Sequence, residues 1–68
     1  MISYKPLKRL MLERELKSTD MINLLKISSA TMSKINANQY VSLEIIDRIC
    51  IKLSCNIEDV VEHVKKED

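Results

Sequence analysis

None of the 68 residues in this chain is glycine. Glycine adopts positive φ at no steric cost and lets a backbone approach a ligand closely. Its absence argues against phosphate-cradling loops, dinucleotide-binding turns and tight β-hairpins, which depend on it. A chain of this length forms at most one small domain and buries only about 60% of the surface that its unfolded form exposes. We therefore predict a single domain over residues 1–68 with a dense core, and a frayed tail at residues 65–68.

The composition favours a helical, soluble domain with an uneven charge. Hydrophobic residues make up 46% of the chain but aromatic residues only 3%, so Leu, Ile, Val and Met must fill the core. Charged residues make up 31%, which together with this apolar content is typical of a folded soluble protein. The net charge of +1 divides into +3 over residues 1–17, +1 over residues 18–40 and −3 over residues 41–68. This polarity leaves room for a basic binding surface within a nearly neutral total.

The sequence predicts neither secretion nor membrane insertion, because charges interrupt residues 1–16 and no long apolar run occurs elsewhere. We expect a cytoplasmic protein in which Cys50 and Cys55 are reduced thiols. Together with His63 they are the only soft metal ligands, fewer than the four of a structural zinc site. A Cys–His nucleophile pair would also need a pocket and an orienting third group. We therefore predict no metal, cofactor, small-molecule ligand or enzymatic activity.

The spacing of the apolar residues predicts five short amphipathic helices. The first covers residues 6–15, because Pro6 fits the first turn of a helix. The second follows a polar cluster in which the hydroxyls of Ser18 and Thr19 are expected to cap the helix and Asp20 to lie in its first turn. The side chains of these two helices expected to face the core are Leu7, Leu10, Met11, Met21, Leu24 and Leu25.

The third helix is predicted after Ser28, which is a good N-cap. Residues 36–41 then break the periodicity with residue types that tolerate turns. Ser42 caps a fourth helix, which carries the longest regular apolar stripe in the chain. Its solvent-facing side is formed by the charged residues Glu44, Asp47, Arg48 and Lys52. The core-facing residues predicted for the third and fourth helices are Met32, Ile35, Leu43, Ile46, Ile49, Cys50 and Leu53.

A fifth helix is predicted after Asn56, with Asp59 in an acidic first turn. Its apolar residues recur at i, i+3, i+4 and i+7, and they are Ile57, Val60, Val61 and Val64. Near the start of the chain, Ile2 and Tyr4 alternate with Ser3, a spacing that also permits a short strand. Five helices this short predict a compact globule in which crossing helices each bury one apolar stripe.

The second and third predicted helices, joined by about three residues around Ile27, form a helix-turn-helix pattern. Residues 27–35 resemble the turn and recognition helix of the Cro/C1-type helix-turn-helix family, also called the Xre family. Residues 4–7, 40–44 and 56–62 resemble further segments of its small stand-alone members, so the resemblance extends over nearly the whole chain. It implies an all-α, five-helix, lambda-repressor-like domain that binds double-stranded DNA.

Two residues depart from the pattern of the family. Lys26 stands where the family usually has glycine before the turn, and a lysine in the left-handed conformation would cost about 1 kcal/mol or more. Ile22 stands where the family often has alanine, which changes the expected distance between the two helices of the motif. We expect these departures to affect the docking angle on DNA and not the fold.

The resemblance also assigns site residues. Those that face bases are Ser29, Ala30 and Lys34, since serine pairs with any base, alanine touches a thymine methyl and lysine suits guanine O6 and N7. The implied phosphate contacts are Lys17, Ser18, Thr19, Ser28, Thr31, Asn36 and Asn38. Structural roles are the alternative, because Ser28 caps its helix with or without DNA and Lys34 can be an ordinary surface charge. Backbone contact or mere solvation is left open for the basic residues Lys5, Lys8, Arg9 and Arg14.

Two small groups and one lysine supply few strong base contacts, so a lone protomer is expected to discriminate sites poorly. A homodimer on a palindromic operator would multiply this readout. We expect its interface around the end of the fourth helix and the fifth helix, where Ile51 adds apolar surface. Family habit implies a transcriptional repressor in a prokaryotic or phage cytoplasm. The alternative is an antitoxin-like or anti-repressor-like interaction module whose acidic residues 41–68 bind a basic protein.

Overall fold

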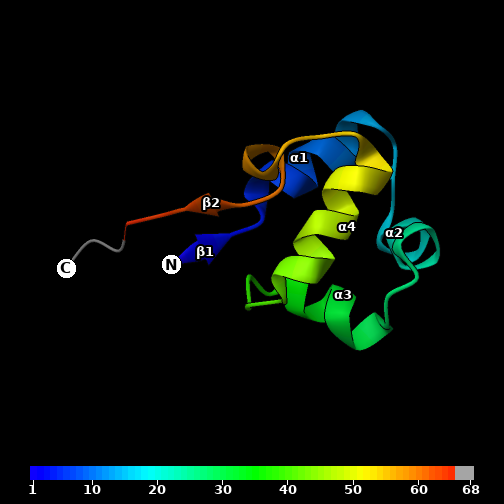
Figure 1. Cartoon of the computed structure of the whole chain (residues 1–68), viewed down its shortest axis with the longest axis horizontal. Helices are drawn as coiled ribbons and strands as arrows, with labels where there is room; N and C mark the ends of the chain where they lie inside the picture. The colour runs from blue at the N-terminus through cyan, green and yellow to red at the C-terminus, as the bar shows by residue number, and fades with distance from the viewer. Residues whose placement is uncertain (66–68) are drawn as a thin grey trace.

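Residues 1–65, which the computed structural model describes, form four α-helices, one 3-10 turn and a pair of two-residue strands (Figure 1). The mostly helical, compact domain predicted from the sequence is thereby confirmed. The predicted tail falls, beyond Lys65, outside the described residues. In chain order the elements are β1 (Ile2–Ser3), α1 (Lys5–Glu13), α2 (Ser18–Leu25), α3 (Ser29–Asn36), α4 (Leu43–Leu53), the 3-10 turn η1 (Ile57–Asp59) and β2 (Glu62–His63).

Three helices begin where their sequence predicts, within a residue. Pro6 lies in the first turn of α1, where its missing N–H costs nothing. The hydroxyl of Ser28 accepts a hydrogen bond from the Thr31 N–H at 3.1 Å, which caps α3. The hydroxyl of Ser42 caps α4 in the same way, accepting from the Ile45 N–H at 3.3 Å. Each cap satisfies one of the donors that a helix leaves unpaired at its start.

Helix α2 begins differently from the prediction. Its N-cap is Lys17, and the carboxylate of Asp20 reaches back to accept a hydrogen bond from the Lys17 N–H at 2.8 Å. Ser18 and Thr19 therefore lie inside the first turn and do not cap the helix. The acidic residue takes over the capping role because its longer reach and its charge both suit the positive end of the helix dipole.

All four helices end in the same way, although no glycine is available. The residue that leads the chain out of each helix has a positive φ, between 51° and 57°, and these residues are Glu15, Lys26, Asn38 and Ser54. The next N–H then donates to the carbonyl five positions earlier, which closes the helix end. The pairs are Leu16 to Met11 at 2.8 Å, Ile27 to Ile22 at 3.3 Å, Gln39 to Lys34 at 2.8 Å and Cys55 to Cys50 at 3.0 Å.

One cluster of buried side chains forms the core of the described residues, namely Tyr4, Leu7, Met11, Met21, Leu25, Ile27, Met32, Ile35, Ile46, Ile49, Leu53 and Val60. The predicted core positions Leu10 and Cys50 are half-buried against it. Two predictions are wrong. Leu24 is 38% exposed, because Met21 and Leu25, four residues apart, already fill the inward face of α2. Leu43 is 77% exposed, because as the first residue of α4 it lies at an open groove.

The predicted fifth helix is not confirmed. Within the described residues the chain after α4 makes only the single turn η1 and then the strand β2, which pairs antiparallel with β1 in the register Ile2 to His63 and Ser3 to Glu62. Val60 is fully buried, but Ile57 and Val64 are exposed, so the expected helical stripe does not form. The short strand permitted by the alternation near the start of the chain is present, and its partner is this segment.

Helix α4 runs through the middle of the molecule and contacts both α2 and η1, while η1 also contacts α1 (Figure 1). Helix α3 contacts α2 and lies at the end of α4 opposite η1. The strand pair extends from the side of the molecule that carries η1 and the start of α1. Among the described residues no helix has the length and apolar character needed to cross a membrane.

Candidate nucleic-acid interface

Helices α2 and α3 form the helix-turn-helix that the sequence predicts. Lys26 turns the chain out of α2 with φ 54° and ψ 47°, the left-handed conformation that usually selects glycine. Ile27 follows and is buried, which fixes the turn to the core. Met32 and Ile35 are buried on the inward face of α3, with exposed fractions of 2% and 0%. Because they anchor one face of a two-turn helix, the opposite face must point to solvent.

The outward face of α3 carries the three predicted base-contact residues. Ser29, Ala30 and Lys34 are all exposed. Ser33 is exposed as well and lies one helical turn beyond Ser29 and Ala30, so the four side chains form one continuous exposed stripe, which is polar except for the methyl group of Ala30. The sequence reasoning missed Ser33, although its i+4 spacing from Ser29 was a signal that would have identified it.

The amino-terminal end of α3 offers donors to an anion. The N–H groups of Ser29 and Ala30, at the start of the helix, have no intrahelical acceptor. They sit at the positive end of the helix dipole. Ser28 is exposed and its hydroxyl lies 3.0 Å from that of Thr31, which is half-buried. The capping role of Ser28 is therefore present without DNA, and its phosphate role remains a prediction.

A second group of predicted phosphate contacts meets where α2 begins and α3 ends. The Asn36 carboxamide donates to the Ser18 hydroxyl at 3.4 Å, so these two predicted residues are neighbours. Lys17 and Thr19, beside Ser18, are exposed. The ammonium group of Lys8 in α1 donates to the Asn36 carbonyl at 3.2 Å. Lys8, which the sequence left undecided, thus places a positive charge beside this group.

Asn38 is separate from that group and has a structural partner. Its carboxamide oxygen accepts a hydrogen bond from the Tyr4 N–H at 2.9 Å, and Asn38 itself has the left-handed φ of 57°. The buried Tyr4 hydroxyl donates to the Gln39 carbonyl at 2.7 Å. Burial raises the pKa of Tyr4 above its ordinary value of 10.0. Tyr4 therefore ties the loop after α3 to the start of α1, and it fixes where α3 ends.

Two arginines serve the ends of helices. Arg14 donates to the carbonyl of Leu53 at the end of α4. Arg48 donates to the carbonyl of Leu25 at the end of α2, at 3.1 Å, and forms an ion pair with Glu44 at 3.2 Å. Cations at these positions complement the negative ends of the helices. Both side chains therefore have structural partners away from the exposed face of α3.

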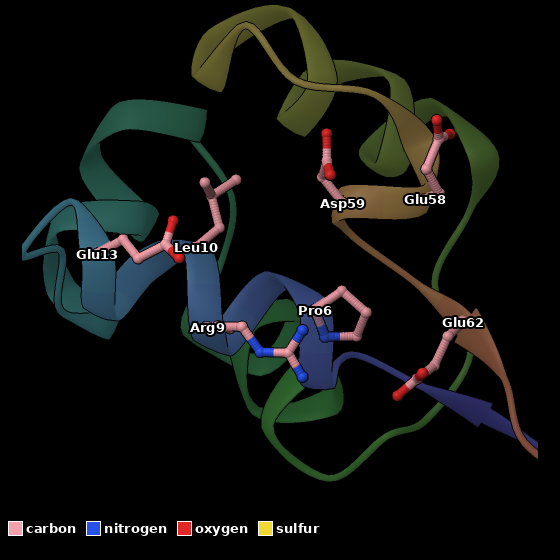
Figure 2. A pocket seen from close by; sticks show the side chains of 7 residues that line it. All are labelled: Pro6, Arg9, Leu10, Glu13, Glu58, Asp59 and Glu62. Carbon is pink, nitrogen blue, oxygen red and sulfur yellow. The ribbon is translucent and has the colours of Figure 1, made fainter.

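Within residues 1–65, the acidic side chains that follow α4 do not lie over α3. Glu58, Asp59 and Glu62 line a groove of about 380 Å³ together with Arg9 and Glu13 of α1 (Figure 2). This groove lies between α1 and η1, and η1 is at the end of α4 opposite α3 (Figure 1). The negative charge of Glu58, Asp59 and Glu62 is thus placed away from the polar stripe of α3, which favours binding of a polyanion there.

Within the described part of the chain, the cysteine thiols do not gather with other side chains into a metal-binding group. Cys50 and Cys55 are free thiols, both half-buried. Burial and the neighbouring Cys50 raise the pKa of Cys55, which favours the neutral thiol over the thiolate that nucleophiles and metal ligands use. Within residues 1–65 there is no group of three or more His, Cys, Asp or Glu side chains placed to hold a metal ion.

Comparison with known proteins supports the helix-turn-helix assignment made from the sequence and the structure. A solved structure, that of the transcriptional regulator VanUg in its crystal form II, superposes with a TM-score of 0.91. It is 29% identical in sequence, over 96% of this chain and 87% of that chain. No curated protein matches this sequence. A family model described as the Cro/C1-type HTH DNA-binding domain matches residues 6–66. The chain therefore belongs to the family of Cro/C1-type helix-turn-helix DNA-binding domains.

Proposed function

We propose that this protein binds double-stranded DNA and regulates transcription, with α3 lying in the major groove. The observation that carries the proposal is the outward polar stripe of α3, held rigidly by the buried Met32 and Ile35. The major groove is about 12 Å wide and admits one α-helix. The family match and the likeness to a transcriptional regulator support the proposal.

Within this proposal the exposed side chains divide into base readers and phosphate contacts. Ser29, Ala30 and Lys34 face base edges, and Ser33 joins them from the same stripe. Phosphates on one flank meet the start of α3, through the hydroxyls and free N–H groups there. Phosphates on the other flank meet the polar group where α2 begins and α3 ends, whose members are Lys17, Ser18, Thr19 and Asn36, with the charge of Lys8 beside it.

We further propose that the protein acts as a repressor by occupying its operator as a homodimer in a prokaryotic or phage cytoplasm. Each good bidentate base contact is worth about 1–3 kcal/mol, and one lysine with small groups supplies few of them. Two half-sites about 34 Å apart multiply this weak readout. A palindromic operator is therefore expected.

The first experiment selects bound duplexes from a random pool with the purified protein and then measures affinity against salt. A DNA reader loses affinity steeply as salt rises, because binding releases counterions from the phosphates. Duplex binding that is absent or insensitive to salt would reject the proposal and favour the interaction module that uses the acidic part of the chain.

Three lysine variants then test which surface of the protein contacts DNA. Lys34→Ala should lower affinity for the selected site about 5–150-fold and relax preference at one base position. Lys17→Ala should weaken binding to all sequences alike and reduce the salt slope by about one. Lys52→Ala, on α4 and exposed, is the matched control and should leave binding unchanged. If Lys34→Ala and Lys52→Ala behave alike, α3 is not the reading helix.

A further inference from the structure

The two cysteines of the chain are neighbours at the carboxyl-terminal end of α4. Cys50 belongs to the last turn of the helix, and Cys55 is the second residue after the helix ends. Both side chains are half-buried and pack against the core. Neither is a predicted DNA contact, and α3 lies at the other end of α4 (Figure 1). The two thiols therefore form a separate site, whose chemistry is independent of DNA binding.

The way in which α4 ends brings the two residues together. Ser54 turns the chain in the left-handed conformation, with φ 51° and ψ 52°. The Cys55 N–H then donates to the Cys50 carbonyl at 3.0 Å, and the Ser54 N–H donates to the Ile51 carbonyl at 3.4 Å. These two hydrogen bonds make a Schellman motif, in which the side chains of the first and last residues commonly contact each other. Here those two side chains are the thiols of Cys50 and Cys55.

The backbone geometry permits a bond between the two sulfur atoms. A disulfide joins residues whose Cα atoms are about 4.4–6.8 Å apart. The 3.0 Å contact between the Cys55 nitrogen and the Cys50 oxygen, with ordinary backbone bond lengths, limits the Cα–Cα separation to at most about 6.9 Å, and to less when the atoms are not in line. The pair can therefore be bridged without moving the backbone.

The two thiols also affect each other's chemistry. Burial raises the pKa of Cys55 above its ordinary value of 9.0, and the charge of Cys50 and the hydrogen bond with its thiol raise it further. Asp59 raises it as well, whereas Arg14 lowers it. At neutral pH Cys55 is therefore held as the neutral thiol, which reacts more slowly than a thiolate. The pair stays reduced unless an oxidant is supplied.

We propose that Cys50 and Cys55 are a redox site that closes to a reversible intramolecular disulfide, with a small-molecule disulfide as the oxidant. One cysteine, as its thiolate, attacks the small disulfide, which forms a mixed disulfide and releases one small thiol. The other cysteine loses its proton and attacks the protein sulfur of the mixed disulfide, which releases the second small thiol. The protein loses two hydrogen atoms, and the two electrons reduce the oxidant to two thiols.

A disulfide suits this pair better than a metal ion does. A structural zinc site needs four ligands, and within residues 1–65 no further side chains join these thiols in a group that could hold a metal. A disulfide needs only the two sulfur atoms that are present. It closes a ring of six residues across the end of α4, which lowers the entropy of the unfolded chain. The disulfide form should therefore unfold at a urea midpoint about 1–2 M above that of the reduced form.

The test equilibrates the reduced full chain with mixtures of oxidised and reduced glutathione and follows its mass after acid quenching. The wild type should become a single chain lighter by two hydrogen atoms, with no glutathione attached. Cys50→Ser and Cys55→Ser should each retain one glutathione, because no second thiol displaces it. Excess dithiothreitol should restore both the starting mass and the lower urea midpoint of the wild type.

A displaced pair of thiols is the matched control. Cys55→Ser combined with Ser54→Cys keeps two cysteines at nearly the same spacing, but position 54 is exposed and lies outside the contact between residues 50 and 55. Its equilibrium constant for disulfide formation should be at least about tenfold lower than that of the wild type under native conditions. In concentrated urea the two constants should agree, since only the folded chain distinguishes the pairs. Far-UV circular dichroism should show that every variant folds.

Three outcomes would overturn the assignment. The wild type could remain fully reduced across the whole glutathione series, or it could retain glutathione on both cysteines or link two chains together. The displaced pair could also close as readily as the wild-type pair under native conditions. Because none of these measurements uses DNA, each of them refutes the redox site and leaves the proposed DNA binding standing.

Discussion

Replacing Lys26 by glycine should stabilise the protein. Lys26 holds φ 54° and ψ 47° at the end of α2, a conformation that costs a residue with a Cβ about 1–2 kcal/mol. Glycine removes this cost but loses about 0.5–1 kcal/mol through its greater freedom in the unfolded chain. Lys26 is exposed, and its backbone hydrogen bond to Ile22 survives the change. The net gain should be about 0.5–1 kcal/mol in the free energy of unfolding.

Urea denaturation followed by circular dichroism measures this gain. A small domain has an m-value of about 1 kcal/mol/M, so the midpoint of Lys26→Gly should rise by roughly 0.5–1 M with no change in slope. Lys26→Ala keeps the Cβ and should show little of the gain. Lys52→Gly is the opposite control, because Lys52 lies within α4, where glycine costs about 1 kcal/mol.

The result that refutes the reasoning is specific. If Lys26→Gly unfolds at or below the wild-type midpoint while Lys52→Gly is destabilised as expected, the left-handed conformation of Lys26 costs no more than the roughly 0.5–1 kcal/mol that glycine loses in the unfolded chain. The reasoning would also be refuted if Lys26→Ala gained as much stability as Lys26→Gly. The gain would then come from removing the lysine side chain beyond its Cβ, and not from removing the Cβ.

Two further predictions concern buried and capping hydroxyls. Tyr4→Phe should cost about 1 kcal/mol near neutral pH by removing the hydrogen bond to Gln39. Burial raises the pKa of Tyr4, so its contribution to stability is present below pH 10 and is lost as the pH rises through the folded-state pKa. The difference in unfolding free energy between wild type and Tyr4→Phe should therefore narrow above pH 10. The control Tyr40→Phe replaces an exposed tyrosine and should show no such difference. Ser28→Ala should lower the urea midpoint by the equivalent of about 1 kcal/mol, because it removes the N-cap of α3. Ser29→Ala removes no cap and should change the free energy of unfolding by less than about 0.5 kcal/mol. Equal effects of the two substitutions would show that the Ser28 hydroxyl does not stabilise α3 as a cap.

The sequence predicted the helices with the clearest apolar spacing, and it failed where local pattern is ambiguous. Met32 and Ile35, with the cap at Ser28, identified α3 because a helical stripe and a capping hydroxyl coincide. The segment after Asn56 has the apolar spacing of a helix, yet it forms the turn η1 and the strand β2, in which no valine lies. What decided between helix and strand was pairing of Glu62 with Ser3, a contact between distant residues that no local window contains.

In the candidate site too, some features could be predicted from the sequence and others could not. Exposure of Ser29, Ala30 and Lys34 follows from the helical period once Met32 and Ile35 face inward. The partner of Asn38 could not be predicted, because the hydrogen bond from Tyr4 depends on how α1 packs against the loop after α3. Among the helix ends, that at Lys26 was anticipated from the glycine that the family usually has there, whereas the left-handed conformations of Glu15 and Ser54 have no signature in the sequence.

The pairing of β1 with β2 has a consequence for the order in which the chain folds and opens. It joins residues about sixty positions apart, so the entropy of closing that loop must be met before the ladder gains anything. The helices, whose contacts are mostly local, can assemble first. The ladder is only two residues long on each side, so it should be the last part to form and the first to exchange its amide protons in D₂O.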